Sequence, residues 1–146
     1  MHELGYLERA LVGLGGADPV HLHWVCPSVV GAGFVGGSSS SIGFRWKGGT
    51  LTVLGVLPGT DRTFANAVSA DGSTVVGTSS SDSFQQAFIW TDSNKMRTMI
   101  DELKARGFEP PVDLQLANVD FISDDGKTMV GMVHGSTLSF WRIVLQ

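Results

Sequence analysis

The stretch that decides the fold is Ser69-Ala70-Asp71-Gly72-Ser73-Thr74-Val75-Val76-Gly77. Its Asp-Gly pair predicts a tight hairpin turn, because glycine adopts positive φ freely and aspartate bonds to nearby backbone. The pattern returns 54 residues later, from position 69 to position 123, as Ser123-Asp124-Asp125-Gly126-Lys127-Thr128-Met129-Val130-Gly131. A partial copy, Val29-Val30-Gly31, lies 46 residues before Val75-Val76-Gly77. This spacing indicates an internal repeat.

Two further markers recur in the same order. One is a small residue followed by Phe, usually with Trp two positions on; it occurs at 43–46, 87–90 and 139–142, where Arg142 takes the Trp place. The other marker pairs Met1-His2-Glu3-Leu4-Gly5-Tyr6-Leu7 with Leu51-Thr52-Val53-Leu54-Gly55-Val56-Leu57, and more weakly with 96–99. Together they predict one domain, residues 1–146, built from units of about 1–50, 51–95 and 96–146.

The units are predicted to consist of strands. In the middle unit we expect strands at 51–57, 65–70, 74–78 and 86–91, with turns at 58–61 and at Asp71-Gly72. In the third unit, Asp125-Gly126 is the matching turn, and helical spacing near 97–106 predicts one short helix that Gly107 ends. The last strands are expected at 118–123 and 139–145.

The expected fold class is therefore all-β, with antiparallel four-strand units arranged as a partial β-propeller. A single unit cannot bury its apolar face alone, so neighbouring units must stack. An open, sandwich-like stack is the second structural hypothesis. The first unit is degenerate over residues 8–28, where the expected Asp-Gly turn is missing. Divergence of the sequence or a slipped reading frame would explain this.

Composition and hydropathy argue against several classes of partner and location. The net charge of −4, without a basic stripe, argues against nucleic acid as a partner. No apolar run reaches the roughly 18 residues of a membrane helix, so no membrane span is expected. The start, Met1 to Gly5, lacks the basic residues and apolar stretch of a signal peptide, so we expect either that the protein is not exported in this way or that the true start lies upstream. Cys26 is the single cysteine and cannot form an internal disulfide.

The markers resemble the HAF-repeat family of bacterial extracellular repeat proteins. The motif at 54–59, then Ala67-Val68-Ser69-Ala70-Asp71-Gly72 and Val75-Val76-Gly77, is similar to the family's unit almost in full. Ala87-Phe88 keeps two residues of the His-Ala-Phe tripeptide, with Gln86 in the His place. The resemblance covers roughly residues 29–146 and implies an extracellular or cell-surface location. It implies no catalytic residue.

Several residue types invite a functional interpretation. Asp71, Asp124 and Asp125 could supply calcium ligands, but one carboxylate per turn is too few, and turn chemistry explains them. His21 and His23, with Cys26, fall short of a four-ligand zinc site. The serines at 38–41 and 79–81 are expected in solvated loops, since no nucleophile elbow surrounds them. Gly31-x-Gly33-x-x-Gly36 precedes no helix, so it is not a phosphate loop.

The recurring aromatics are the remaining candidates. Recurrence by unit predicts that they pack between units, where large rings bury the most area. Trp46 and Trp90 are the candidate ligand-stacking residues, because exposed aromatics mark binding sites. Asp71, Gly72, Asp125 and Gly126 are assigned as structural turn residues.

The function that this pattern favours is a non-catalytic extracellular or cell-surface repeat protein, an interaction or display module. We expect no enzyme activity, cofactor or bound metal, and self-association through exposed sheet edges. The alternative is a hydrolase or lyase on a propeller scaffold, which would need ionisable groups clustered at one end of a channel. An exposed aromatic or polar patch would favour the module.

Overall fold

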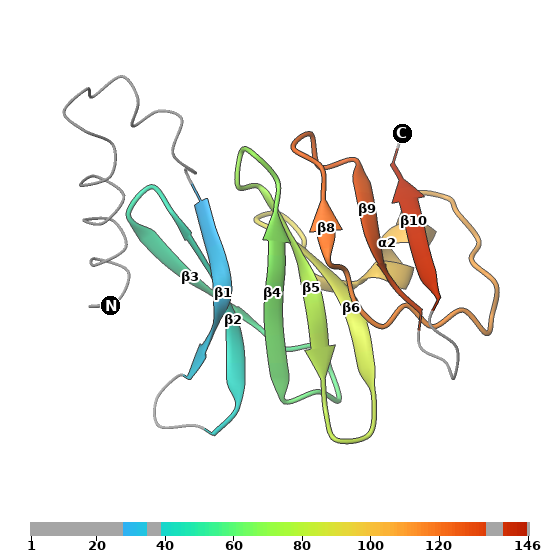
Figure 1. The fold of residues 1–146 in the computed structure, drawn as a ribbon, viewed down its shortest axis with the longest axis horizontal. Helices are drawn as coiled ribbons and strands as arrows, with labels where there is room; N and C mark the ends of the chain where they lie inside the picture. The colour runs from blue at the N-terminus through green and yellow to red at the C-terminus, as the bar shows by residue number, and fades with distance from the viewer. Residues whose placement is uncertain (1–27, 35–38, 134–138, 146) are drawn as a thin grey trace.

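The computed structural model describes residues 28–34, 39–133 and 139–145. The described residues form antiparallel strands and one short helix (Figure 1). The elements are β1 (Ser28–Phe34), β2 (Ser41–Lys47), β3 (Thr50–Gly55), β4 (Arg62–Val68), β5 (Thr74–Ser80), β6 (Gln85–Thr91), β7 (Lys95–Thr98), α2 (Met99–Ala105), β8 (Phe121–Ile122), β9 (Thr128–Met132) and β10 (Phe140–Val144). The predicted β-rich fold with antiparallel pairing is confirmed.

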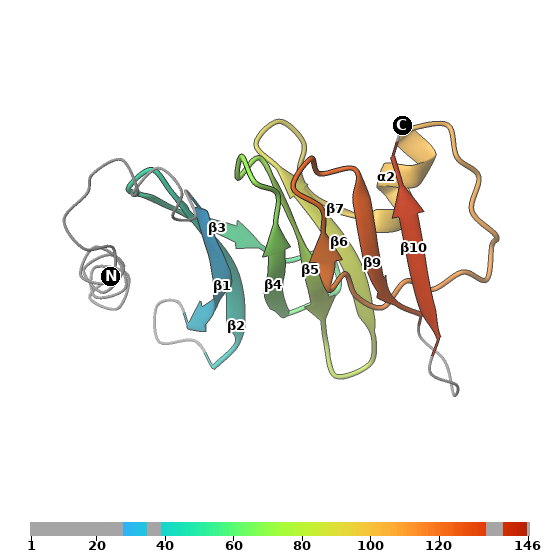
Figure 2. The ribbon, with the colours of Figure 1, turned by 45° about the horizontal axis from the view of Figure 1, so that its top comes forward.

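The strands form three sheets that follow one another along the molecule. Sheet 1 has the order β1-β2-β3, sheet 2 the order β4-β5-β6-β7, and sheet 3 the order β10-β9-β8. Figure 2 shows them side by side in chain order, with sheet 2 in the middle. The described residues do not form a closed ring of sheets, so the propeller arrangement stays a prediction.

The strand at 50–55 does not pair as the sequence units suggested. It pairs with β2, with Trp46 opposite Leu51 and Lys47 opposite Thr50, and therefore closes sheet 1 instead of opening sheet 2. The cause is the two-residue loop Gly48-Gly49, in which both φ angles are positive, as a type I′ hairpin requires. The strand β7 closes sheet 2 in the same way, so the sequence units and the sheets differ in phase by one strand.

The register of the hairpins shows which aromatics are equivalent. Phe44 lies opposite Gly31 and Phe88 lies opposite Gly77, but in sheet 3 the residue opposite Gly131 is Trp141. Matching Phe140 with the two phenylalanines, and Arg142 with their tryptophans, was therefore wrong by one position. Phe88 lies 11 residues after its partner Gly77, whereas Trp141 lies 10 residues after Gly131, so identical letters do not share a register.

Sheet 2 is buried on both faces. Side chains alternate between faces along a strand, so neighbours such as Val75 and Val76 point to opposite sides. The first layer, between sheets 1 and 2, contains Leu54, Leu57, Ala65, Val75, Phe88 and Trp90. The second layer, between sheets 2 and 3, contains Val76, Ala87, Ile89, Met99, Leu103, Leu116, Val119, Ile122, Met129 and Leu145. The described strands thus form a stack of sheets joined by two apolar layers.

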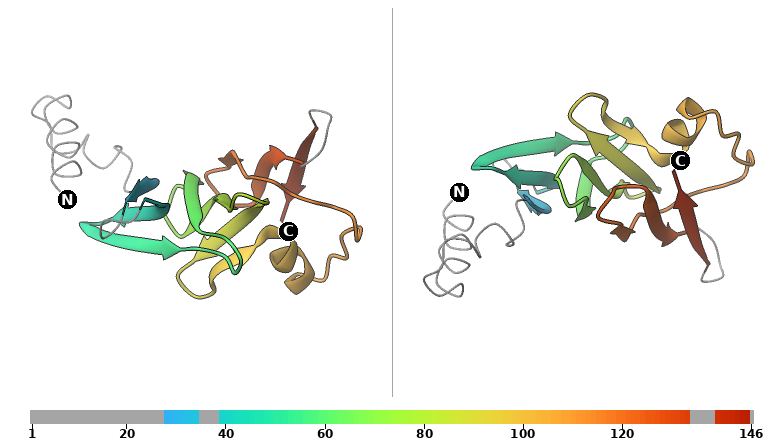
Figure 3. Two further views of the ribbon diagram at one scale, coloured as in Figure 1. Left: turned by 90° about the horizontal axis from the view of Figure 1, so that it is seen from below. Right: turned by 90° about the horizontal axis from the view of Figure 1, so that it is seen from above.

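The helix α2 confirms the short helix predicted near 97–106. Thr98 caps its start, accepting a hydrogen bond from the Asp101 amide at 3.0 Å. Gly107 follows the helix with φ of 83°, a conformation that glycine adopts without strain. Met99 and Leu103 anchor the helix in the second layer, beside sheet 3 (Figure 3).

Candidate functional site

The two Asp-Gly turns are built alike. In the first, the Gly72 amide donates to Ser69 O at 2.9 Å, and the Asp71 carboxylate accepts from the Ser73 amide at 3.0 Å. In the second, the Gly126 amide donates to Ser123 O at 2.9 Å, and the Lys127 amide donates to the Asp125 carboxylate at 2.9 Å. Gly72 and Gly126 have φ of 74° and 75°. The structural role predicted for these residues agrees with this geometry.

The turn hydrogen bonds change the acidity of the carboxylates. The Ser73 amide and hydroxyl, together with the Ser69 hydroxyl, lower the pKa of Asp71 to about 2. The hydroxyl of Ser123 and the amide of Lys127 lower the pKa of Asp125 in the same way. Hydrogen bonds to the charged form favour it, so both turns carry a carboxylate that stays ionised in ordinary conditions.

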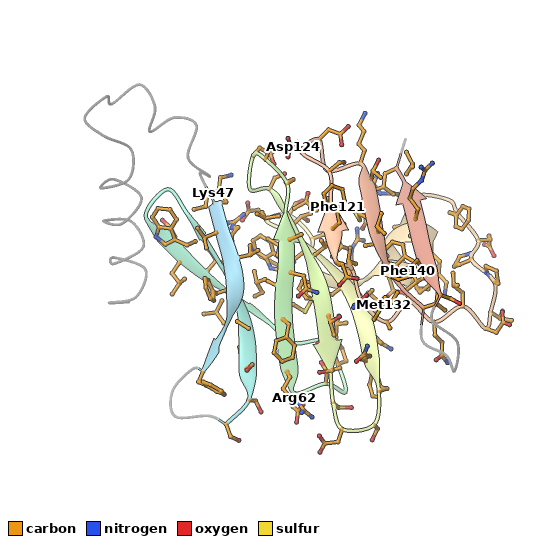
Figure 4. All side chains as sticks on the ribbon, in the orientation of Figure 1. Lys47, Arg62, Phe121, Asp124, Met132 and Phe140 are labelled. Atoms are coloured by element: carbon orange, nitrogen blue, oxygen red, sulfur yellow. The ribbon has the colours of Figure 1, made fainter. Side chains whose placement is uncertain are left out.

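The turns also touch each other across the sheets. The Ala70 amide donates to Asp124 O at 3.1 Å, which joins the end of sheet 2 to the end of sheet 3. Figure 4 shows Asp124 beside the first turn, at the upper edge of the sheets. The two Asp-Gly turns therefore meet along one edge of the stack, between sheets 2 and 3.

The ring of Trp90 lies under a buried arginine. Trp90 is buried in the first layer, and the guanidinium of Arg45, from sheet 1, stands 4.5 Å from its centroid. Lys95 reaches the same ring at 5.7 Å. The face that a ligand would need is thus used by the protein, and Trp90 acts in packing between sheets. Trp46 is half-buried, on the face of sheet 1 turned away from sheet 2.

Arg45 holds sheets 1 and 2 together. Its side chain is 6% exposed and donates to Gly72 O at 2.8 Å and to both carboxylate oxygens of Asp92, at 3.0 and 3.1 Å. The hydrogen bond from Arg45 lowers the pKa of Asp92. Sequence reasoning missed this residue. The sequence did contain a signal for it. Arg45 lies between Phe44 and Trp46, and because side chains alternate along a strand, Arg45 points to the face opposite these two aromatics, toward the next sheet.

One face of sheet 3 is apolar and open. Trp141 and Ile143 pack on the second layer, so alternation places Phe140, Arg142 and Val144 on the opposite face. Phe121 is 53% exposed, Phe140 64% and Val144 52%. Val130 pairs with Phe121 and Arg142, and Met132 pairs with Phe140, which joins the strands into one patch. Figure 4 labels Phe121, Met132 and Phe140, three members of this free face of sheet 3.

Two cavities flank α2. One, of about 550 Å³, lies between β6 and the start of α2 and is lined by Phe84, Gln85, Gln86, Ala87, Thr98, Ile100, Asp101, Leu114, Gln115 and Leu116. Asp101 is the one ionisable side chain in that lining. The other, of about 660 Å³, runs between the end of α2 and β10, with Arg106, Phe108, Arg142 and Val144 among its walls.

The remaining predicted residues fall in different places. Ser79 and Ser80 belong to β5, and Ser79 is fully buried, so the solvated loop predicted there is wrong. The Ser79 hydroxyl accepts from the Leu57 amide and donates to Arg62 O, both at 3.2 Å. His21, His23 and Cys26 lie outside the described residues, as does Gly36. Within the described ranges, no group of three or more His, Cys, Asp or Glu side chains could hold a metal ion.

No protein-family model matches the chain, and no curated protein matches its sequence. In the part of the chain that the structure describes, no helix has the length and apolarity needed to cross a bilayer.

Proposed function

We propose that the chain is a non-catalytic interaction module, part of a bacterial extracellular or cell-surface repeat protein, that binds other protein surfaces through the free face of sheet 3. The resemblance to HAF repeats supports the location. The binding role is carried by one observation: the free face is the structural equivalent of a face that is buried elsewhere in the same chain.

Register makes the equivalence explicit. Ile89 lies opposite Val76 in sheet 2, and Arg142 lies opposite Val130 in sheet 3. Val76 and Ile89 are 0% and 3% exposed, because sheet 3 covers them. Phe140, beside Arg142, is 64% exposed. A repeat that buries this face once is expected to bury it again, and contiguous apolar patches on soluble proteins mark interaction sites.

The sheet edges offer a second way to associate. In sheet 3, the Val133 amide bonds to Ser139 O and the Leu145 amide bonds to Lys127 O, so alternation turns the backbone groups of Phe140, Arg142 and Val144 outward. In the described residues no strand pairs with this edge of β10. Edges of this kind recruit strands from other chains by backbone hydrogen bonding.

A photo-crosslinking amino acid placed at Phe140, in cells that produce the protein, tests the binding role. Illumination is expected to join the protein covalently to another polypeptide. The matched control carries the same amino acid at Asp82, an exposed position in the loop between β5 and β6. Equal yields of adduct from the two positions would contradict a binding face on sheet 3.

A further inference from the structure

We infer that the partner of the free face of sheet 3 is a second copy of this chain, which docks through the outer face of its sheet 1, with Arg142 of one copy stacked on Trp46 of the other. The outer face of sheet 1 is the face turned away from sheet 2, and it carries Phe44, Trp46, Leu51 and Val53. This inference deepens the proposed function and rests on it.

The template for this contact already exists inside the chain. Where sheet 1 meets sheet 2, Arg45 stands 4.5 Å from the centroid of the ring of Trp90, a member of the first layer. We call a sheet face forward when it points in the direction from sheet 1 to sheet 3, and backward when it points the opposite way. Arg45 projects from the forward face of sheet 1, and Trp90 projects from the backward face of sheet 2. The contact of Arg45 with Trp90 is therefore an example, within this chain, of a forward face packing on a backward face.

Arg142 occupies the position of Arg45. Arg45 lies opposite Val30 and Arg142 lies opposite Val130, and each of these valines precedes the glycine of a repeat motif. Both arginines thus point forward from their sheets. In sheet 3 nothing in the described residues meets this side chain with a tryptophan, and the residue is exposed. The forward face of the stack ends with an arginine suited to an aromatic partner.

Trp46 occupies the position of Trp90. Trp46 lies opposite Val29 and Trp90 lies opposite Val75, the equivalent valines of their repeats. Both rings therefore point backward. On sheet 1 the neighbours of Trp46 are apolar and open, since Leu51 is 38% and Val53 51% exposed. The backward end of the stack thus offers the ring and the apolar surroundings that Arg142 and Phe140 require.

One part of the internal contact is absent from the proposed one. Asp92 stands two residues after Trp90 and holds Arg45 with two hydrogen bonds, whereas Gly48 stands two residues after Trp46. The contact between copies consequently depends on ring stacking and apolar burial, without that ion pair. It should be weaker than the internal contact and should form reversibly with concentration.

The two faces differ, so the association is head to tail. A head-to-tail contact leaves one forward face and one backward face free on each pair of copies, unlike a two-fold contact, in which each copy uses the same patch. This difference provides a decisive test: two variants that are each defective on a different face should complement one another.

Sedimentation velocity of the full chain over a range of concentrations provides the readout. The wild-type protein is expected to associate as concentration rises. Arg142→Glu should weaken association by about tenfold or more. This is the scale of a lost cation–π contact plus repulsion between the new carboxylate and the negative face of the Trp46 ring. Val53→Asp should do the same from the other face, as should Trp46→Ala if its melting temperature matches the wild type. Lys127→Glu makes the same charge change at an exposed turn residue and should leave association intact.

Mixing then separates head-to-tail from two-fold association. Arg142→Glu and Val53→Asp proteins should each stay monomeric alone and should form pairs when mixed, because one keeps its backward face and the other its forward face. A wild-type protein that stays monomeric at every concentration, or mixed variants that do not pair, would overturn the inference. Crosslinking from Phe140 to a different polypeptide alongside a monomeric wild type would refute the second copy as partner while leaving the proposed function standing.

Discussion

Glycine at position 77 is required by the backbone of the neighbouring strand. A Cβ there would overlap Phe64 O and would lie only 3.0 Å from a ring atom of Phe88. Gly77→Ala should therefore destabilise the fold by about 3 kcal/mol, at the upper end of overpacking costs. Urea unfolding measures the change. Gly33→Ala is the matched control, because nothing lies within 4 Å of its added Cβ, and equal losses would contradict the assignment.

The depressed acidity of Asp71 predicts a pH dependence. Its folded pKa is about 2, because the Ser73 and Ser69 groups donate to the carboxylate. In the unfolded chain the value is about 3.9, so its contribution to stability is complete above about pH 4 and is lost as pH falls toward about 2. Asp71→Asn should make the stability curve flatter in that window. Urea titrations at several pH values test this, with Asp113→Asn, an exposed aspartate, as the control.

At this scale the sequence predicted what is local. The Asp-Gly turns follow from residues that bond to their own neighbours, so position alone decides them. The predicted equivalence of Phe140 with Phe88 was wrong because it depends on register, and register depends on how many residues separate the paired positions of a hairpin. The predicted solvent exposure of Ser79 was also wrong, since its hydrogen-bond partners come from distant segments.

Between elements, Arg45 and Asp92 carry the contact of sheet 1 with sheet 2. Asp92→Ala leaves the guanidinium of Arg45 buried without its carboxylate, and breaking a buried pair on one side is costly. Because Asp92 itself is largely exposed, we expect a loss of about 1–3 kcal/mol, short of the cost in a fully buried pair. Thermal unfolding is the measurement.

Asp82→Ala is the matched control for that prediction. It removes the partner of Arg62 from a surface ion pair in which the Asp82 side chain is 93% exposed, and such pairs contribute about 0–1 kcal/mol. A loss at Asp82 as large as that at Asp92 would show that Arg45 does not clamp the sheets.

Elements were predicted better than their pairing. The helix near 97–106 and the strands of sheet 2 follow from periodicity, capping and glycine positions in the sequence. The partner of β3 did not, because marker order placed it in the second unit. The Gly48-Gly49 pair between Trp46 and Leu51 was a usable hairpin signal, and it favours β2 as the partner.

At the scale of the molecule, sheet 2 couples the stability of sheet 1 to that of sheet 3, because it contributes to both apolar layers. Its two faces supply the first layer with Phe88 and the second with Ile89, neighbours on one strand. The sequence predicted stacking, because one unit cannot bury its own face. It could not distinguish an open stack from a closed ring, since the local patterns of strands and turns are the same in both.

This coupling predicts one cooperative unit. Phe88→Ala opens the first layer and should cost about 3–5 kcal/mol, the range for a buried phenylalanine. If the sheets unfold together, hydrogen exchange in dilute solution should speed up in β9, which packs only on the second layer, as much as in β5. Phe140→Ala truncates the same side chain at an exposed position and should leave exchange unchanged. Faster exchange confined to sheets 1 and 2 would instead show that sheet 3 is stable without the first layer.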